Sequence, residues 1–237
     1  MNMIVRPLLY LSLCCSLAFS PAFGGEIFQK DFTQNAISKS DLSGIEMWTG
    51  APVESWGKVM VDSLPSGVDG SPQKALTITT NVNNPPAPDG SKFCPSITVK
   101  TPKCGSGGDK KTAVFLLRFM VPVDGPYRAD IHFGGNWGSN ATVLVLNKND
   151  INAMTKDTPT KLATYDANAW QELRLEFDCT NKTFSVSHNG NQVANGIPWN
   201  DPKLNSVDSL EIVAGGMPVP KDGTPVLYLQ KIDISEE

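Results

Sequence analysis

The sequence has no segment with sustained helical periodicity, and this absence argues against helix bundles and against alternating α/β folds. Histidine is scarce as well: His132 and His188 are the only two, which argues against a zinc site. The net charge is −4 with Lys and Arg scattered along the chain, so there is no basic stripe for nucleic acid or for an anionic membrane surface. Neutral or weakly charged partners fit this composition best.

Long apolar runs are also missing, and the single short one near the N-terminus has the features of a secretory signal peptide. Arg6 precedes an apolar stretch at residues 7–19, and small residues stand at Ala22 and Gly24, the two positions that a signal peptidase reads. The stretch is shorter than the roughly 20 apolar residues of a membrane span. We therefore expect a signal peptide at residues 1–24 and a secreted or periplasmic mature protein, residues 25–237, that forms one domain.

Cysteine becomes sparse once the signal peptide is set aside, because only Cys94, Cys104 and Cys179 remain. In an oxidising compartment the near pair, Cys94 and Cys104, is predicted to form a disulfide bond. So short a ring would contribute roughly 2–3 kcal/mol of stability. Cys179 is then left over, either buried and inert or available to another chain. Three cysteines allow three pairings, so closeness in sequence is the argument for this one.

What the chain does contain is period-two alternation of apolar and polar residues, which is typical of β-strands. Residues 127–133 and 170–177 alternate in this way, and residues 112–122 form the continuous apolar run of a central strand. Turns rich in Asn, Asp and Gly separate the segments. Residues 148–157 predict a single turn at most. Roughly twelve short strands without helices predict an all-β fold, a two-sheet antiparallel jelly-roll sandwich.

Residues 170–193, WQELRLEFDCTNKTFSVSHNGNQV, resemble the central hairpin of the concanavalin A-like lectin/glucanase superfamily, with the laminin G-like branch most similar. IFQKDF at 27–32 and LYLQKIDI at 227–234 are similar to the first and last strands of that family, which usually pair side by side. The resemblance covers most of residues 25–237 as a structural pattern. It implies a jelly roll whose members commonly bind or cleave polysaccharides, and fold likeness alone does not carry function.

Glu172 and Glu176 are the catalytic pair in the alternative of a glycoside hydrolase. Retaining enzymes of family 16 share this fold and carry Glu-x-Asp-x-Glu on one strand. Here the two carboxylates are roughly 13 Å of strand apart, whereas a retaining pair needs about 5 Å. Arg174 replaces the middle Asp, and a guanidinium there would lower both carboxyl pKa values, although a general acid needs a raised one. A solvated Glu-Arg-Glu ladder is the simpler interpretation.

Other catalytic and metal-binding signatures are incomplete. The sequence has no Gly-x-Ser-x-Gly elbow and no phosphate-binding loop. Polysaccharide lyases on this scaffold use a Gln-x-His strand with Arg and Tyr partners, but here Tyr127 alternates to the opposite face from His132. Calcium is only weakly indicated, at Asn147, Asn149 and Asp150, because this set contains a single carboxylate and a Ca²⁺ site usually has more. We expect no metal and no other cofactor.

The Gly- and Asn-rich loop that follows His132 is the candidate ligand site. Sugars present apolar C–H faces and hydroxyl edges, so Trp137 would serve as a stacking platform, and Asn136 and Asn140 would supply donors and acceptors. The strand before the loop carries three polar residues on one face, Arg128, Asp130 and His132. The alternative is a plain hairpin whose Trp137 folds back over the core.

Three functions follow from these features. The first, which we expect, is a secreted and non-catalytic carbohydrate-binding sandwich whose partner is a polysaccharide or another glycan. The second is a polysaccharide-active glycoside hydrolase or lyase on the same fold. The third is a structural or adhesive module whose loops bind protein and whose Cys179 cross-links chains.

Overall fold

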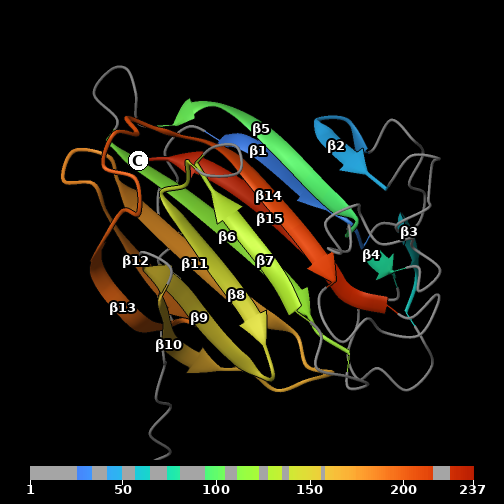
Figure 1. The fold of residues 1–237 in the computed structure, drawn as a ribbon. Coiled ribbons are helices and arrows are strands. Elements are labelled where there is room, and N and C mark those ends of the chain that lie inside the picture. The colour runs from blue at the N-terminus through green and yellow to red at the C-terminus, as the bar shows by residue number, and fades with distance from the viewer. Residues whose placement is uncertain are drawn as a thin grey trace, which may run out of the picture.

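Fifteen strands form two antiparallel sheets in the computed structural model, shown in Figure 1. The structure describes residues 26–33, 42–49, 57–64, 74–80, 94–104, 111–122, 128–134, 139–155, 158–215 and 225–237. The predicted signal peptide, residues 1–24, lies outside these ranges. Within them, no helix has the length and the apolar character needed to cross a membrane.

The first sheet, sheet A, has eight strands with β6 (Thr112–Met120) and β15 (Pro225–Glu236) at its centre. On one side of this central pair lie β11 (Gln171–Asp178), β12 (Thr183–His188) and β13 (Asn191–Pro198). On the other side lie β4 (Lys74–Thr80) and β3 (Gly57–Ser63). The first strand, β1 (Glu26–Asp31), pairs with β15. This pairing confirms the expectation that the first and last strands lie side by side.

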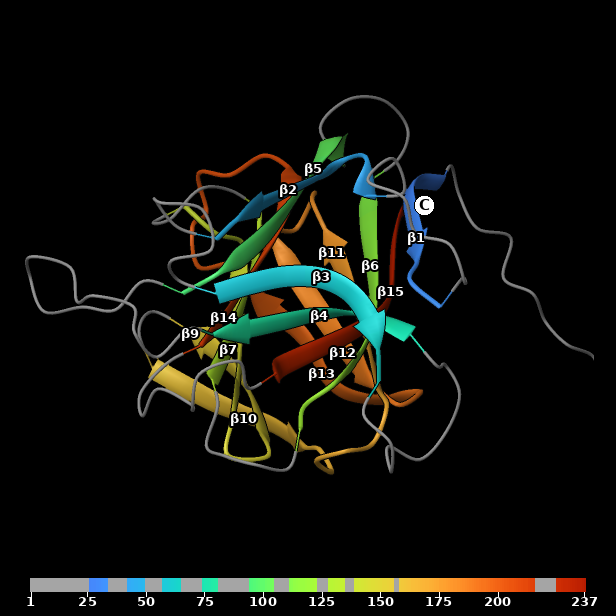
Figure 2. The same ribbon diagram turned by 90° about the vertical axis from the view of Figure 1, so that its right-hand side faces the viewer.

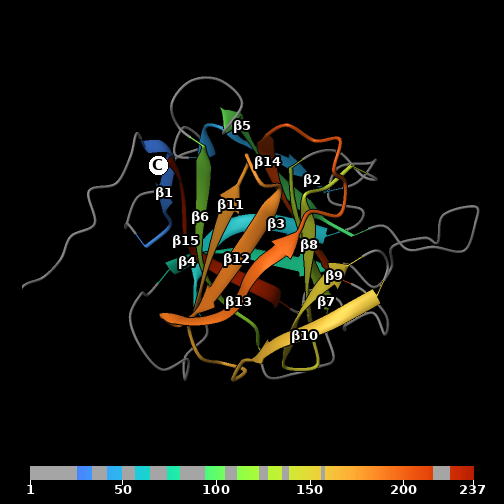
Figure 3. The ribbon, with the colours of Figure 1, turned by 90° about the vertical axis from the view of Figure 1, so that its left-hand side faces the viewer.

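The second sheet, sheet B, has seven strands with β7 (Arg128–Phe133) in the middle. On one side of β7 lie β8 (Thr142–Asn147), β9 (Asp150–Thr155) and β10 (Thr158–Thr164). On the other side lie β14 (Val207–Gly215), β5 (Ser96–Cys104) and β2 (Ile45–Trp48). Figures 2 and 3, which show opposite sides of the molecule, place β1, β6 and β15 in one layer and β7, β9 and β14 in the other.

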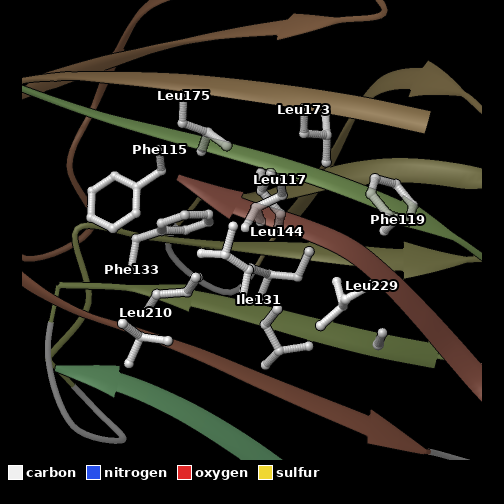
Figure 4. Packing of buried hydrophobic residues seen from close by; sticks show 14 of the residues in the cluster. Phe115, Leu117, Phe119, Ile131, Phe133, Leu144, Leu173, Leu175, Leu210 and Leu229 are labelled. Carbon is white, nitrogen blue, oxygen red and sulfur yellow. The ribbon is translucent and has the colours of Figure 1, made fainter. Parts of the chain in front are cut away.

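The core lies between the two sheets because each sheet turns its apolar residues inward. Along β11, buried and half-buried side chains alternate without exception, so Leu173, Leu175 and Phe177 point into the core. Phe115 of β6 meets Phe133 of β7 edge-on, with ring centroids 5.3 Å apart, across the gap between the sheets (Figure 4). Such edge-to-face contacts are a favourable arrangement for aromatic rings. The predicted all-β sandwich is thus confirmed.

Two-residue hairpin loops account for one correction to the sequence-based expectations. Lys148 and Asn149 both have positive φ angles, 50° and 65°, and so do Asn189 and Gly190, at 49° and 78°. Positive φ at both central residues is the signature of a type I′ turn, whose twist matches that of paired strands. Residues 148–157, predicted to form a single turn, therefore contribute a hairpin loop and then strand β9. Short strands of this kind bring the number among the described residues to fifteen, compared with the roughly twelve that were expected.

The predicted disulfide bond between Cys94 and Cys104 is incompatible with β5. Cys94 precedes the strand, which begins at Ser96, and Cys104 is its last residue. Residues 96 and 104 lie opposite Val213 and Val207 of β14, which are roughly 20 Å apart at the rise of an extended strand, and a disulfide needs Cα atoms within about 7 Å. The prediction was based on closeness in sequence, whereas residues 96–104 form a strand that pairs with β14 and, over residues 96–99, with β2. Cys179, predicted as the unbridged cysteine, is buried.

Candidate functional site

Strand β7 brings three of the predicted site residues to the outer face of sheet B. Its odd-numbered residues, Ala129, Ile131 and Phe133, are buried in the core. The side chains of a strand alternate between its two faces. The three polar residues therefore share the opposite face, as the alternation predicts; they are Arg128, Asp130 and His132.

Neighbouring strands extend this face by placing further side chains in register with β7. Glu211 of β14 and Val143 of β8 are the cross-strand partners of His132. Directly opposed residues on paired strands point to the same side of the sheet. The outer face therefore carries a row that passes through the centre of sheet B, with Thr98 of β5 next to Glu211. Asp130 has apolar neighbours instead, Val213 and Val145.

Arg128 and Asp130 form an ion pair along this face. Nε of Arg128 donates to Oδ1 of Asp130 at 2.6 Å. This hydrogen bond raises the pKa of Arg128, and the guanidinium stays charged throughout the physiological range. The Arg128 side chain is 47% exposed and that of Asp130 is 20% exposed, so the pair is within reach of a ligand.

His132 differs from these two neighbours because it is buried, with 7% of its surface exposed. Burial lowers its pKa, and this effect outweighs the opposing influence of the carboxylates of Glu211 and Asp130. The imidazole is therefore neutral at pH 7. The amide of Asn140, which is also buried, lies 3.3 Å from Nδ1 of His132. If Asn140 donates in this contact, the neutral ring carries its proton on Nε2.

The contact between Asn140 and His132 holds the C-terminal end of the Gly- and Asn-rich loop against the outer face of sheet B. At the start of the loop, the amide of Gly134 donates to the carbonyl of Ser209. At its end, the hydroxyl of Ser139 donates to Asp201 at 2.8 Å, and Ala141 bonds back to Phe133. Both ends of the loop are thus fixed beside β7 and β14. Trp137 and Asn136, predicted to contact the ligand, lie outside the described residues, as does Tyr127.

Trp48 is a large exposed aromatic residue on this face; from sequence, its segment, residues 46–59, could contribute a second aromatic wall, but Trp48 was not a predicted site residue. It is 59% exposed, at the end of edge strand β2. Its cross-strand partner is Ser96, whose other neighbour is Val213, and Val213 pairs in turn with Asp130. The signal in the sequence was weak because β2 has only four residues, of which Ile45 alone is buried.

The alternative catalytic pair, Glu172 and Glu176, lies on the outer face of the opposite sheet. Nε of Arg174, between them, donates to Glu176 at 2.8 Å, and its terminal nitrogen lies 3.4 Å from Glu237. Glu172 faces Arg118 of β6. This arrangement has the form of the solvated ladder described above, with the guanidinium paired to one of the two carboxylates.

The described residues contain no group of three or more His, Cys, Asp or Glu side chains that could hold a metal ion. Asp150, the one carboxylate in the weakly indicated calcium set, is engaged by the ammonium of Lys161 at 2.7 Å. Asn147 and Asp150 are opposed at the end of the β8–β9 hairpin, and Asn149 lies in the loop between them. Their positions follow from the needs of a type I′ turn.

No protein-family model matches the sequence, and no curated protein does so either. Several solved structures share the fold. A sialidase superposes with a TM-score of 0.59 at 12% sequence identity, over 90% of this chain and 18% of that one. The CBM2 module of the evolved Dit of Lactobacillus casei BL23 phage J-1 superposes at 0.52 with 11% identity, over 90% of this chain and 95% of the module. The binding domain of botulinum neurotoxin serotype D/C superposes with a TM-score of 0.50 at 9% sequence identity, over 89% of this chain and 48% of that one.

These likenesses establish a β-sandwich fold and do not single out the concanavalin A-like superfamily. The chain spans about a fifth of the sialidase and about half of the neurotoxin chain. It spans nearly the whole of the phage module.

Proposed function

We propose that the protein is a secreted, non-catalytic carbohydrate-binding sandwich of the concanavalin A-like type, and that the outer face of sheet B binds the glycan. Trp48 carries the proposal, because an exposed indole stands in one row with Ser96, Val213 and Asp130 across four strands. The likeness to the CBM2 module, whose name denotes carbohydrate binding, supports it at the level of fold.

The chemistry of this row, and of the neighbouring row through Glu211 and His132, suits a sugar chain. The indole of Trp48 offers an apolar plate for C–H faces, and the carboxylates of Asp130 and Glu211 accept hydrogen bonds from hydroxyl edges. Three strand spacings separate Trp48 from Asp130, roughly 14 Å at the usual distance between neighbouring strands. This width fits an oligosaccharide better than a single ring. Trp137, on the loop that is fastened next to His132, is proposed as a second platform.

A glycan array with a parallel reducing-sugar assay tests the proposal directly. Binding without turnover is the expected result. Turnover would favour the glycoside hydrolase or lyase, and neither binding nor turnover would favour the adhesive module. The mature protein is expected to begin near Gly25, which N-terminal sequencing of secreted material would check.

Trp48→Ala separates binding from folding. Truncation of a Trp at the centre of a contact typically costs 2 kcal/mol or more of binding, about 30-fold in Kd. Because Trp48 is exposed, its removal leaves no core cavity, and stability should change by no more than about 0.5 kcal/mol. Trp137→Ala is expected to weaken binding as well.

Met60→Ala is the matched control, because Met60 is 45% exposed on β3 of the opposite sheet. It should leave glycan affinity unchanged. Equal losses of affinity in Trp48→Ala and Met60→Ala, measured by calorimetric titration, would refute the location of the site.

A further inference from the structure

We propose that the outer face of sheet B selects glycans without acidic groups, and that Glu211 is the residue that excludes sialylated and uronic acid-containing chains. The inference rests on the proposed function and names the chemical class of its ligand. It follows from how the charges on this face are paired.

Three cations of the described part of this face are each held by a neighbouring carboxylate. Arg128 pairs with Asp130 at 2.6 Å, and two further pairs join Lys100 to Glu46 at 3.0 Å and Lys161 to Asp150 at 2.7 Å. Acidic sugars are recognised through their carboxylates, and an arginine fork is the geometry that matches such a group. Nε of Arg128 is occupied by Asp130, so a ligand carboxylate that approached the terminal nitrogens of the guanidinium would also approach the carboxylate of Asp130. These cations are therefore poorly placed to recognise an acidic sugar.

Glu211 adds a negative charge at the centre of the same face. Among the described residues it has no ion-pair partner, and its cross-strand neighbours are His132 and Thr98. His132 does not neutralise it, since the buried imidazole is uncharged at pH 7. Thr98 contributes a hydroxyl and no charge. A ligand carboxylate placed over the row of Thr98, Glu211 and His132 would therefore meet an uncompensated charge on Glu211.

A neutral glycan meets no such penalty, and the same carboxylate helps to bind it. The oxygens of Glu211 are acceptors for sugar hydroxyls, and the hydroxyl of Thr98 supplies both a donor and an acceptor. Two like charges that face each other across an interface weaken binding. Such a repulsion acts against acidic ligands only, so it determines which glycan binds more than how tightly a neutral glycan binds. Glu211 thus acts as a specificity-determining residue.

The experiment compares matched neutral and acidic glycans on the wild type, Glu211→Gln and Glu176→Gln. The pairs are lactose with sialyllactose, and the hexasaccharide of galactose with that of galacturonic acid. Glutamine keeps the size and a hydrogen-bonding oxygen of Glu211 but removes its charge. Glu176→Gln makes the same change on the opposite sheet and serves as the control. Thermal melting of each variant verifies that it is folded.

The wild type is expected to prefer the neutral member of a pair by at least about tenfold, the size of a single close like-charge contact. Glu211→Gln should reduce this preference several-fold, mainly by strengthening the binding of the acidic member. Glu176→Gln should leave the ratio of neutral to acidic glycan affinity unchanged. Added salt should reduce this ratio in the wild type, because it screens the repulsion between the two carboxylates.

The inference would be overturned if the wild type bound acidic and neutral glycans with equal affinity, or if Glu211→Gln left the ratio of the two affinities unchanged. Carbohydrate binding itself would remain supported in both cases. Binding to no glycan on the full array would instead overturn the proposed function and this inference with it.

Discussion

Two tryptophans illustrate how position decides the role of a residue. Trp199 is 4% exposed, its indole N–H donates to the carbonyl of Thr183 at 3.0 Å, and the ammonium of Lys182 lies 5.2 Å from its ring. Both the ring and its polar atom are therefore used by the fold. Trp48 exposes most of its surface at the end of an edge strand. An exposed aromatic residue contributes little to folding, so contact with a ligand is the best account of its position.

Both histidines are buried in a way that makes stability depend on pH. Burial lowers the pKa of His132 and that of His188, whose Nε2 lies 2.8 Å from Oε1 of Gln171. In the unfolded chain a histidine has a pKa of about 6.5. As pH falls through this value, the unfolded state binds protons before the folded state does. The stability present above pH 6.5 is therefore lost as pH falls further.

We expect the free energy of unfolding, measured with urea, to decrease between pH 7 and pH 5. The pKa values of Asp178 and Asp201 are also lowered, chiefly by hydrogen bonds from backbone amides, but from a normal value of 3.8, so they act below this window. His188→Gln and His132→Gln should each flatten the dependence, even if they lower stability overall. A wild type that is equally stable at both pH values would contradict the prediction.

At the scale of elements, local alternation predicted the strands that have a buried side, because period-two patterns need only a few adjacent residues. β11 and β7 were predicted in this way. β9 was missed because its outward residues, Asn152 and Met154, follow two turn residues and obscure the alternation. Register between distant strands leaves no such local trace, so neither the pairing of Glu211 with His132 nor the place of Trp48 could be predicted. The same lack of long-range information led to the wrong disulfide.

Two glycines at strand ends test how backbone and packing contribute to these elements. Gly190, in the β12–β13 hairpin, has a φ of 78°, and a Cβ there would meet no atom within 4 Å. Gly57, which begins β3, has a φ of 156°, and a Cβ there would collide with the carbonyl oxygen of Thr79 and lie 2.8 Å from a ring carbon of Pro95. The first position is constrained by backbone conformation alone, the second by backbone and space together.

Gly190→Ala should therefore cost about 1–2 kcal/mol, the penalty for an L-residue in the left-handed region. Gly57→Ala should cost more, because overpacking against rigid backbone adds roughly 1–3 kcal/mol. Urea unfolding of the two variants provides the comparison. If Gly190→Ala were the more destabilising of the two, the backbone geometry described for β3 would be wrong.

For the molecule as a whole, the two sheets share one core but expose different chemistry. The outer face of sheet A carries a ladder of charges in which Arg174 pairs with Glu176 and Glu237, and Lys231 pairs with Asp233. The outer face of sheet B combines Trp48, the contact between Asn140 and His132, and the row through Glu211 and His132. If the glycan binds to the outer face of sheet B, the outer face of sheet A is not required for binding. The ladder of charges on sheet A is therefore expected to contribute mainly to solubility.

Glu172→Gln and Glu176→Gln examine this division of roles, since both residues lie on the face that we do not assign to ligand. Exposed ion pairs contribute about 0–1 kcal/mol, so neither variant should lower the free energy of unfolding by more than that. Glycan affinity should stay within about twofold of the wild type, because a carboxylate on the far side of the core is well beyond the screening length of about 8 Å at physiological salt. Thermal melting and glycan titration measure the two effects separately. If either change abolished a hydrolytic activity by orders of magnitude, the glycosidase would replace the binding module.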